Sequence, residues 1–266
     1  MNTRTLRPLS MAAALIAAAS ALPVVAADNL TMTGSDLIQG RTLKFGNETP
    51  DGRSMGSFEV RDSSNNEFWV YCLDPLTGFS TAQPYSTMPL STWLLSNGTA
   101  NNGYDALFDT SRYTNNTIDD NRTAGGYFDR NTTTVLNKLT ELYQHAYNDS
   151  LTSELKSAAF QYAIWEIEGD TGYSATDSTG GLEYTGGNST FEAQVGQYLG
   201  ALNTGNWAAV GLAAVTNFTF TVYQPGVGSS QVLLSAKPSG VPEPSTLALA
   251  LLGVVGAASL SRRKAS

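Results

Sequence analysis

Apolar residues alternate with polar ones near both ends of the central region of the chain, and they recur at helical spacing in its middle. Residues 58–60 and 67–73 have strand character and flank a turn-forming run at 62–66, so they predict a β-hairpin. Both faces of the second strand are apolar, one formed by Phe68, Val70 and Cys72 and the other by Trp69, Tyr71 and Leu73. We therefore expect this strand to be buried on both sides.

Helices are predicted between this hairpin and a closing one. Apolar residues recur every three or four positions over 134–147, and the polar run 148–150 separates this helix from a second at 151–168. A third is expected at 190–202, with Asn188 and Ser189 as capping candidates. Residues 218–223 and 231–236 alternate and predict the closing hairpin. The order predicts an α+β fold: a mainly antiparallel β-sheet or barrel-like domain with a helical insertion.

The first residues of the chain have the pattern of a secretory signal peptide. Arg4 and Arg7 precede an apolar run at 11–22, and small residues at 25–27 suit cleavage after Ala27. We therefore expect a signal peptide at 1–27, and signal peptidase as a partner during export. The segment 28–236 that follows is long enough for one domain or two small ones, and we treat it as one.

The C-terminal segment 237–266 combines three parts in a fixed order. An apolar stretch at 246–260 is marginal in length for a membrane-spanning helix. Basic residues behind such a stretch are typical of the cytoplasmic end of an anchor. The stretch is preceded by Pro242, Glu243 and Pro244 and followed by the basic residues Arg262, Arg263 and Lys264.

This arrangement resembles the PEP-CTERM sorting signal. The resemblance implies that an exosortase recognises the tail in the inner membrane of a Gram-negative bacterium that makes exopolysaccharide, and then removes it. Pro242, Glu243 and Pro244 are then the sorting motif, the apolar stretch is a transient transmembrane helix, and the basic residues are a stop. The exported protein is expected at the cell surface or in the extracellular biofilm matrix. A plain C-terminal membrane anchor is the alternative interpretation of the same pattern.

The balance of charge limits the classes of partner. The chain has 266 residues and a formal net charge of −8 at pH 7. Few Lys or Arg side chains are present to neutralise phosphates, which argues against nucleic acid as a partner. The sequence contains no phosphate-binding loop, metal-ligand spacing or Ser-His-Asp set, so we expect neither a cofactor nor a metal.

Cys72 is the only cysteine of the chain and therefore has no partner for a disulfide. In the predicted second helix, Gln161 lies among apolar residues and shares a face with Ala158 and Trp165. A buried glutamine needs hydrogen-bond partners or a chemical purpose. If this helix docks on the strand that carries Cys72, thiolate attack on the carboxamide carbon of Gln161, with loss of ammonia, leaves an intramolecular thioester.

The segments Tyr71-Cys72 and Gln161-Tyr162-Ala163-Ile164-Trp165 resemble the two motifs of thioester domains in surface adhesins of Gram-positive bacteria. The resemblance implies a Cys72–Gln161 thioester that an amine or hydroxyl group of a surface or polysaccharide ligand opens once, with covalent attachment. Phe160 stands where members of that family often have threonine. Such a protein is a single-use reagent for adhesion rather than an enzyme. The aromatic side chains expected to shield the bond from water are Trp69, Tyr71, Phe160 and Trp165.

Other interpretations of the same residues stay open at this point. A free cysteine is commonly buried, so Cys72 can be an inert thiol in a non-covalent structural or carbohydrate-binding protein of the exopolysaccharide matrix. His145, the only histidine, can pair with Cys72 in a cysteine hydrolase, although its helical position predicts a solvent-facing side chain. Asp74 belongs either near the thiol or to an Asp-Pro turn. Glu166 and Glu168 face different directions on their helix and therefore do not form an acid–base pair.

Overall fold

The computed structural model describes residues 28–45, 53–75, 77–80, 84–95, 132–169, 182–214, 217–226 and 230–239. The predicted signal peptide at 1–27 and residues 240–266 of the tail predicted at 237–266 lie outside these ranges. The elements follow one another as β1 (Asp28–Asn29), β2 (Thr31–Arg41), β3 (Leu43–Phe45), β4 (Arg53–Arg61), β5 (Glu67–Cys72), β6 (Pro84–Pro89), α1 (Leu90–Leu94), α3 (Thr132–Ser150), α4 (Glu154–Gly169), β7 (Leu182–Tyr184), α5 (Ser189–Thr204), the 3₁₀ helix η3 (Trp207–Val210), β8 (Phe218–Pro225) and β9 (Leu233–Pro238).

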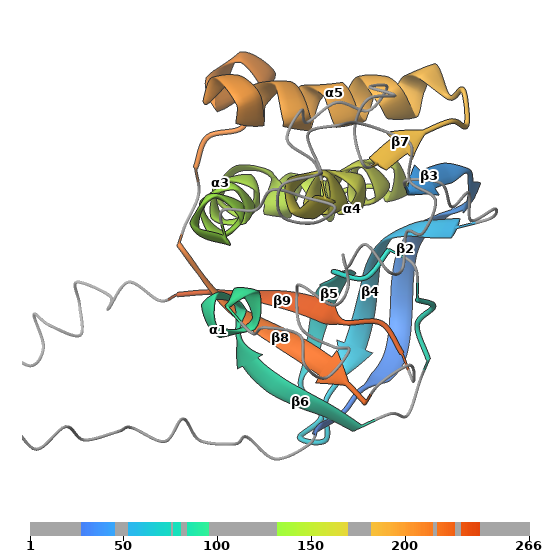
Figure 1. The fold of residues 1–266 in the computed structure, drawn as a ribbon, viewed down its shortest axis with the longest axis vertical. Helices are drawn as coiled ribbons and strands as arrows, with labels where there is room; N and C mark the ends of the chain where they lie inside the picture. Colours follow the sequence, from blue (N-terminus) through green and yellow to red (C-terminus); the bar gives the residue numbers. More distant parts are fainter. Residues whose placement is uncertain are drawn as a thin grey trace, which may run out of the picture.

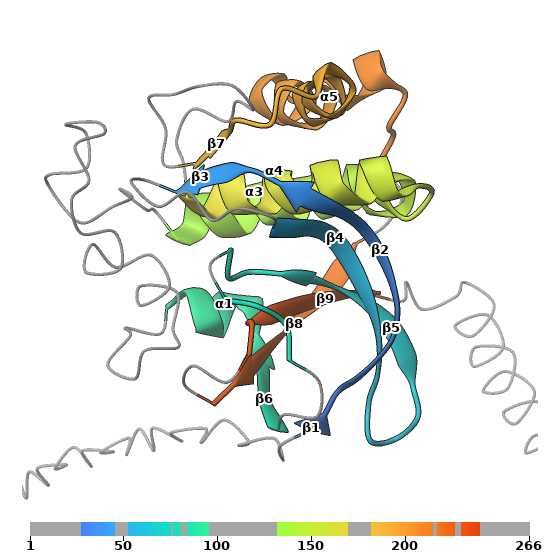
Figure 2. The same cartoon turned by 90° about the vertical axis from the view of Figure 1, so that its right-hand side faces the viewer.

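Seven of the described strands form one antiparallel sheet in the order β1-β6-β8-β9-β5-β4-β2. The sheet is strongly curled, as expected for a barrel-like domain (Figures 1 and 2). The short strands β3 and β7 pair separately, beside the helices. The fold is therefore α+β, with helices inserted between the strands of a curled antiparallel sheet.

Both predicted hairpins are present. β4 and β5 pair in a register that runs from Phe58 opposite Val70 to Arg61 opposite Glu67. The carboxylate of Asp62 closes their turn by accepting bonds from the N–H groups of Ser64 (2.9 Å) and Asn66 (2.8 Å). β8 and β9 form the closing hairpin. Turn chemistry and strand alternation act over short distances along the chain, which is why the sequence pattern predicts these elements.

β5 is buried less evenly than its sequence predicts. Residues 70–73 are buried, whereas Phe68 and Trp69 are half-buried and Glu67 is exposed. The expectation of burial on both sides is therefore correct only for the C-terminal half of this strand. α4 packs against β4 and β2, and its Gln161 and Trp165 side chains reach Cys72 at the end of β5.

The three predicted helices are present as α3, α4 and α5; the first and third are longer than predicted, and α4 begins at Glu154 instead of residue 151. The predicted break at 148–150 is wrong, since α3 continues to Ser150 and the chain turns at 151–153. The carboxylate of Asp149 accepts from the ammonium of Lys156 (2.6 Å) and from the hydroxyl of Tyr198 (2.7 Å). This polar run therefore joins α3 to α4 and α5 instead of ending the helix.

α4 is the central helix of the molecule. It lies between the sheet and α5, with α3 beside it (Figure 1). Every residue from Ser157 to Gly169 is buried. Apolar side chains on all sides of a helix suit such a position. The few polar side chains on α4 consequently lie inside the protein, where each requires a partner or a purpose.

Several elements do not follow from the sequence pattern. β2 pairs with β4, but register shifts between Met32 and Gly34 and between Ile38 and Arg41 interrupt the pairing. Such bulges break the alternation of apolar and polar residues on which strand prediction depends. β6 and α1 are also absent from the sequence-based prediction.

Candidate functional site

The site lies where β4 and β5 separate. In the described ladder of these strands, pairing ends with Phe58 opposite Val70. Gly56 of β4 lies opposite Leu37 of β2, and its φ of +138° and close approach to Asp36 exclude any side chain, since a Cβ would lie 2.0 Å from the Asp36 main-chain oxygen. Between Gly56 and Phe58, the N–H of Ser57 donates to the hydroxyl of Ser157 on α4, at 2.8 Å. α4 thus approaches the sheet at the gap between the two strands.

Beyond the last β4–β5 pair, the side chain of Gln161 on α4 takes the place of β4 opposite Cys72. The N–H of Leu73 donates to Val232 on the β9 side (2.8 Å), so alternation along the strand directs the N–H and C=O of Cys72 toward β4. There Oε1 of Gln161 accepts from the N–H of Cys72 at 2.7 Å, and Nε2 of Gln161 donates to the carbonyl of Cys72 at 2.7 Å. The carboxamide therefore replaces a strand residue and is fixed in orientation.

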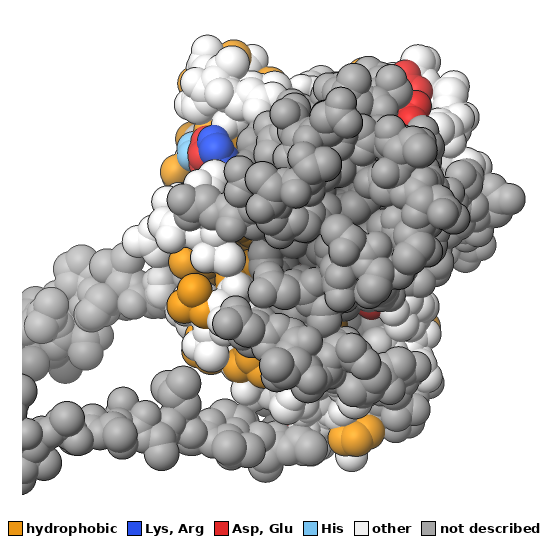
Figure 3. Space-filling model, viewed as in Figure 1, with side chains coloured by type: hydrophobic (Ala, Val, Ile, Leu, Met, Phe, Trp, Pro, Cys, Tyr) orange, Lys and Arg blue, Asp and Glu red, His pale blue; other side chains and the backbone are white. Residues whose placement is uncertain are grey.

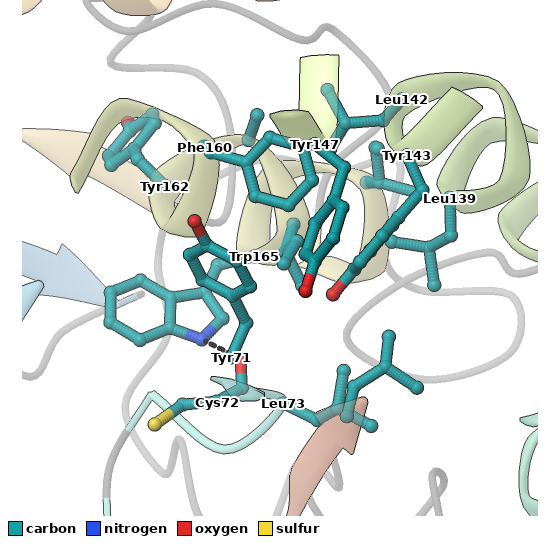
Figure 4. Close-up of a cluster of buried hydrophobic side chains, with 14 of the residues drawn as sticks. Tyr71, Cys72, Leu73, Leu139, Leu142, Tyr143, Tyr147, Phe160, Tyr162 and Trp165 are labelled. Carbon is teal, nitrogen blue, oxygen red and sulfur yellow. Dashed lines mark hydrogen bonds between the residues drawn. The ribbon is translucent and has the colours of Figure 1, made fainter. Parts of the chain in front are cut away.

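Trp165 completes this contact one turn further along α4. Its indole Nε1–H donates to the same carbonyl of Cys72, at 3.0 Å (Figure 4). Ser157, Gln161 and Trp165 are spaced four residues apart and so form one stripe of the helix. Gln161 is 1% exposed and Trp165 is 2% exposed. The two residues, which helical spacing puts on one face, thus lie against the strand of Cys72.

The thiol of Cys72 has a different partner. Its Sγ–H donates to Oε1 of Gln231 at 2.5 Å. Cys72 is paired with Leu233, so Gln231, two residues earlier, is its diagonal neighbour on the same face. The sequence analysis did not identify Gln231 as a site residue. The only signal for it is its register relative to Cys72, which requires knowing that β9 pairs with β5.

The surroundings of the thiol disfavour its ionisation. Burial raises the pKa of Cys72 well above its ordinary value, and the negative charges of Asp74 and Glu168 raise it further. Glu168 lies three residues beyond Trp165 and seven beyond Gln161, on the same side of α4. The carboxylate of Asp74 also accepts from the N–H of Thr77 at 3.2 Å, as the turn interpretation expects. Cys72 is therefore a thiol at neutral pH.

The other predicted shielding residues lie on the helix-facing side of the strand. The rings of Tyr71 and Phe160 are 4.7 Å apart and belong to a cluster that includes Tyr143 and Tyr147, while the sulfur of Cys72 points away from it (Figure 4). The hydroxyls of Tyr71 and Ser150 are hydrogen-bonded at 2.7 Å. These residues hold α3 and α4 on the sheet. Trp69 is half-buried, and of the four predicted residues only Trp165 has a described hydrogen bond to Cys72.

His145 is not the solvent-facing residue that its helix position predicts. It is half-buried, and its ring stacks on Trp207 at 4.8 Å and 5°. Its Nδ1 lies 2.9 Å from the carbonyl oxygen of Leu212. These contacts draw the ring onto the segment after α5, and neither partner has a described contact with Cys72. They give no support to a Cys-His pair.

The remaining charged side chains of interest lie in α4 and on the described surface. Glu166 and Glu168 are both fully buried in α4. No group of His, Cys, Asp and Glu within the described ranges could hold a metal ion. On the face drawn in Figure 3, described acidic and basic side chains form only small groups.

The C-terminal tail matches a known family of sorting signals. Residues 240–264 match the family described as PEP-CTERM protein-sorting motif. The chain therefore carries this motif, which implies processing by an exosortase and export to the cell surface or the extracellular space. No helix within the described residues is both long and apolar enough to cross a membrane. Comparison with curated protein sequences gave no significant match.

Two solved structures are similar to this chain at low sequence identity. The N-terminal domain of the Streptococcus pyogenes pilus tip adhesin Cpa is 15% identical, with a TM-score of 0.43 over 80% of this chain and 99% of that domain. A variant of the N-terminal thioester domain of a surface protein from Clostridium perfringens is 16% identical, with a TM-score of 0.35 over 75% of this chain and 98% of that domain. Similarity at this level assigns no role to any residue of this chain.

Proposed function

We propose that this exported protein forms an intramolecular thioester between Cys72 and Gln161. It uses the bond to attach itself covalently to an amine- or hydroxyl-bearing ligand on a surface or polysaccharide. One observation carries the proposal: the Gln161 carboxamide is held by two hydrogen bonds to the main chain of the cysteine that would attack it. A second support is the Tyr71-Cys72 and Gln161-to-Trp165 motif pattern of the sequence.

The hydrogen bonds favour the chemistry of bond formation. The N–H of Cys72 donates to Oε1 of Gln161, the oxygen on which negative charge develops during attack, and such a donor stabilises the transition state. The carboxamide continues the ladder, whereas the Cys72 side chain projects out of the sheet, so rotation about Cα–Cβ brings sulfur over the face of the carbonyl carbon. The S–C bond forms, the C–N bond breaks, and the thiol proton leaves with ammonia.

The carbonyl of Cys72 keeps a hydrogen-bond donor after ammonia has left. It loses the Nε2 donor of Gln161 but retains the indole donor of Trp165. An orphaned carbonyl at this buried position would oppose the reaction. Cys72, Gln161 and Trp165 are all at most 3% exposed, and exclusion of water slows hydrolysis of the bond.

Attachment follows when a nucleophile of the ligand attacks the thioester carbonyl carbon. The new C–N or C–O bond forms, the C–S bond breaks, and the proton of the nucleophile passes to sulfur. The ligand remains joined to the side chain of residue 161, and Cys72 is a thiol again. Each molecule reacts once, so the protein is a reagent for adhesion and not a turnover enzyme.

The sorting part of the proposal concerns the two ends of the chain. Signal peptidase removes the signal peptide after Ala27, and the apolar stretch 246–260 holds the protein transiently in the inner membrane. An exosortase then processes the tail, which leaves the domain at the cell surface or in the extracellular matrix. The PEP-CTERM match at 240–264 supports this route.

Mass spectrometry of the exported protein tests the thioester. We expect the wild type to be one ammonia lighter than its sequence requires, relative to Cys72→Ala, which has the same processed ends. Methylamine should add one amine to the wild type and restore a thiol. Gln161→Ala and Gln161→Glu should abolish both the ammonia deficit and the adduct, whereas Gln144→Leu on α3 should retain them.

The peptide that contains residue 161 decides between the remaining outcomes. A glutamate at this position shows that a thioester formed and was hydrolysed. Full mass together with an unmodified glutamine contradicts the thioester. Cys72 is then an inert buried thiol, and the protein is a non-covalent component of the extracellular matrix.

A further inference from the structure

Cys72 lies between two carboxamides on opposite sides of β5. On the β4 side, Gln161 engages the main chain of Cys72. On the β9 side, Gln231 accepts the thiol proton at 2.5 Å. Gln231 is itself buried, with 9% of its surface exposed, and its Nε2 lies 3.5 Å from the main-chain oxygen of Asp74. The thiol is thus held on the side away from the acyl group that it would attack.

We infer that Gln231 holds the sulfur away from residue 161 whenever the thioester is open, and so makes ligand attachment one-way. This inference rests on the proposed function. When a ligand opens the bond, the sulfur leaves as a thiol because its buried surroundings disfavour the thiolate. Rotation about Cα–Cβ then places the S–H on Oε1 of Gln231, which is the arrangement seen here.

The reaction that Gln231 opposes is closure of the bond with loss of the ligand. In this reverse step the sulfur attacks the amide carbon at residue 161, the S–C bond forms and the C–N bond to the ligand breaks. The thiol proton leaves with the departing amine. The thiol must first give up its hydrogen bond to Gln231. A neutral hydrogen bond of this kind corresponds to a rate difference of about twofold to tenfold.

The infrared S–H stretching band tests the contact directly. The chain has one cysteine, so the methylamine-opened protein has a single S–H band. A hydrogen-bonded S–H absorbs at lower frequency than a free one, so Gln231→Leu should shift the band upward. Gln231→Glu keeps an oxygen acceptor of the same reach and should keep the band low. Gln144→Leu removes a glutamine that bonds to Asn217 instead, and should leave the band unchanged.

Isotope exchange tests the one-way role. The thioester is opened with methylamine that carries deuterium on its methyl group, and the protein is then transferred to unlabelled methylamine. Loss of the labelled amine is followed by the intact mass of the protein. Each exchange requires closure and reopening of the thioester. We expect Gln231→Leu to exchange about twofold to tenfold faster than the wild type, and Gln231→Glu to exchange at a rate close to that of the wild type.

Each outcome has a separate meaning. A band that Gln231→Leu does not shift overturns the contact. The one-way role is overturned if Gln231→Leu exchanges no faster than the wild type. It is also overturned if neither protein shows detectable exchange. An ammonia deficit that maps to residue 231 instead of 161 overturns it too, because Gln231 is then the acyl group. A protein that never takes up methylamine contradicts the proposed function, whereas its S–H band still reports on the contact.

Discussion

Each polar group of Cys72 is bound by a side chain from elsewhere in the sequence. Gln161 and Trp165 bind its main chain from α4, and Gln231 binds its thiol from the residues before β9. Buried polar groups require such partners, so the three contacts fix the position of the cysteine more narrowly than apolar packing alone. The predictions at the scale of single residues therefore compare buried side chains that have different neighbours.

The first prediction uses the two buried glutamates of α4. In the methylamine-opened protein, Glu168→Gln should lower the pKa of the Cys72 thiol, because it removes one of the charges that oppose ionisation. Burial is the larger cause and remains, so the pKa stays above the ordinary value of 9.0. Glu166→Gln, on another side of the same helix, should leave it unchanged. Thiolate absorbance measured against pH checks this, and equal shifts in both variants would contradict it.

The same shift predicts how stability depends on pH. Cysteine in the unfolded chain ionises near its ordinary pKa of 9.0, whereas the folded thiol ionises only at higher pH. Stability from this group is therefore complete below pH 9.0 and is lost as pH rises toward the folded pKa. Urea titrations of opened protein above pH 9.0 should show a smaller loss for Glu168→Gln than for the wild type. A larger loss would reverse the sign and reject the explanation.

Two tyrosines of one buried cluster give a matched pair. The hydroxyl of Tyr71 is bonded to that of Ser150 at 2.7 Å, whereas the hydroxyl of Tyr143 has no hydrogen-bond partner among the described residues. Tyr71→Phe should lower the free energy of unfolding by about 1 kcal/mol, and Tyr143→Phe should raise it by a similar amount. Urea unfolding of both variants measures this. Equal destabilisation by the two changes would count against the difference in hydrogen bonding.

The residues of the candidate site differ in how well the sequence predicts them. Gln161 and Trp165 follow from helical spacing in a run that is otherwise apolar, and Cys72 is the only cysteine. Gln231 does not follow from any local pattern, because its place beside the thiol depends on the pairing of β5 with β9. The stacking of His145 on Trp207 is equally non-local. Contacts between distant segments require the register and the packing, which a single sequence does not contain.

At the scale of elements, α4 connects the sheet to the helical layer. Its stripe of Ser157, Gln161 and Trp165 bonds to β4 and β5, while its other sides pack on α3 and α5. The bounds of these helices deviate from prediction where polar side chains serve tertiary contacts, as Asp149 does. Local pattern thus predicts that an element exists better than it predicts where the element ends.

The start of α5 provides a prediction at this scale. Asn188 caps the helix, since its Oδ1 accepts from the N–H of Phe191 at 3.0 Å, whereas Ser189 is the first helical residue. Asn188→Ala should lower the free energy of unfolding by about 1 kcal/mol. Ser189→Ala should change it little. Thermal or urea unfolding of the two variants distinguishes the capping candidates, and a larger effect at Ser189 would refute the assignment.

At the scale of the whole molecule, the described domain is followed by the PEP-CTERM motif at 240–264. The domain supplies the candidate chemistry, and the motif supplies the sorting signal. The sequence predicts the motif well because its three parts are contiguous, unlike the parts of the site. A substitution in the Pro-Glu-Pro segment distinguishes a sorting motif from a plain membrane anchor, because it leaves the apolar stretch unchanged.

Glu243→Ala should strongly reduce the amount of protein at the cell surface, because it alters the sorting motif while leaving the apolar stretch 246–260 intact. Ser245→Ala, directly after the Pro-Glu-Pro part of the motif, should have no effect. Deletion of residues 242–266 should release the protein into the medium. Immunoblots of cell-surface and medium fractions measure all three. A surface level that Glu243→Ala does not change would favour the plain anchor.

The position of β9 has a mechanical consequence. This strand runs from Leu233, beside Cys72, to Pro238, just before the sorting motif, and it lies between β8 and β5. In a protein held at the cell surface through the C-terminal end of β9 and joined to a ligand at Gln161, tension passes from α4 through the hydrogen bonds of Cys72 into β5 and then along β9. A pull along a strand loads its ladder bonds together, since they lie perpendicular to it. Drag on the ligand is then resisted by the β5–β9 and β8–β9 ladders at once.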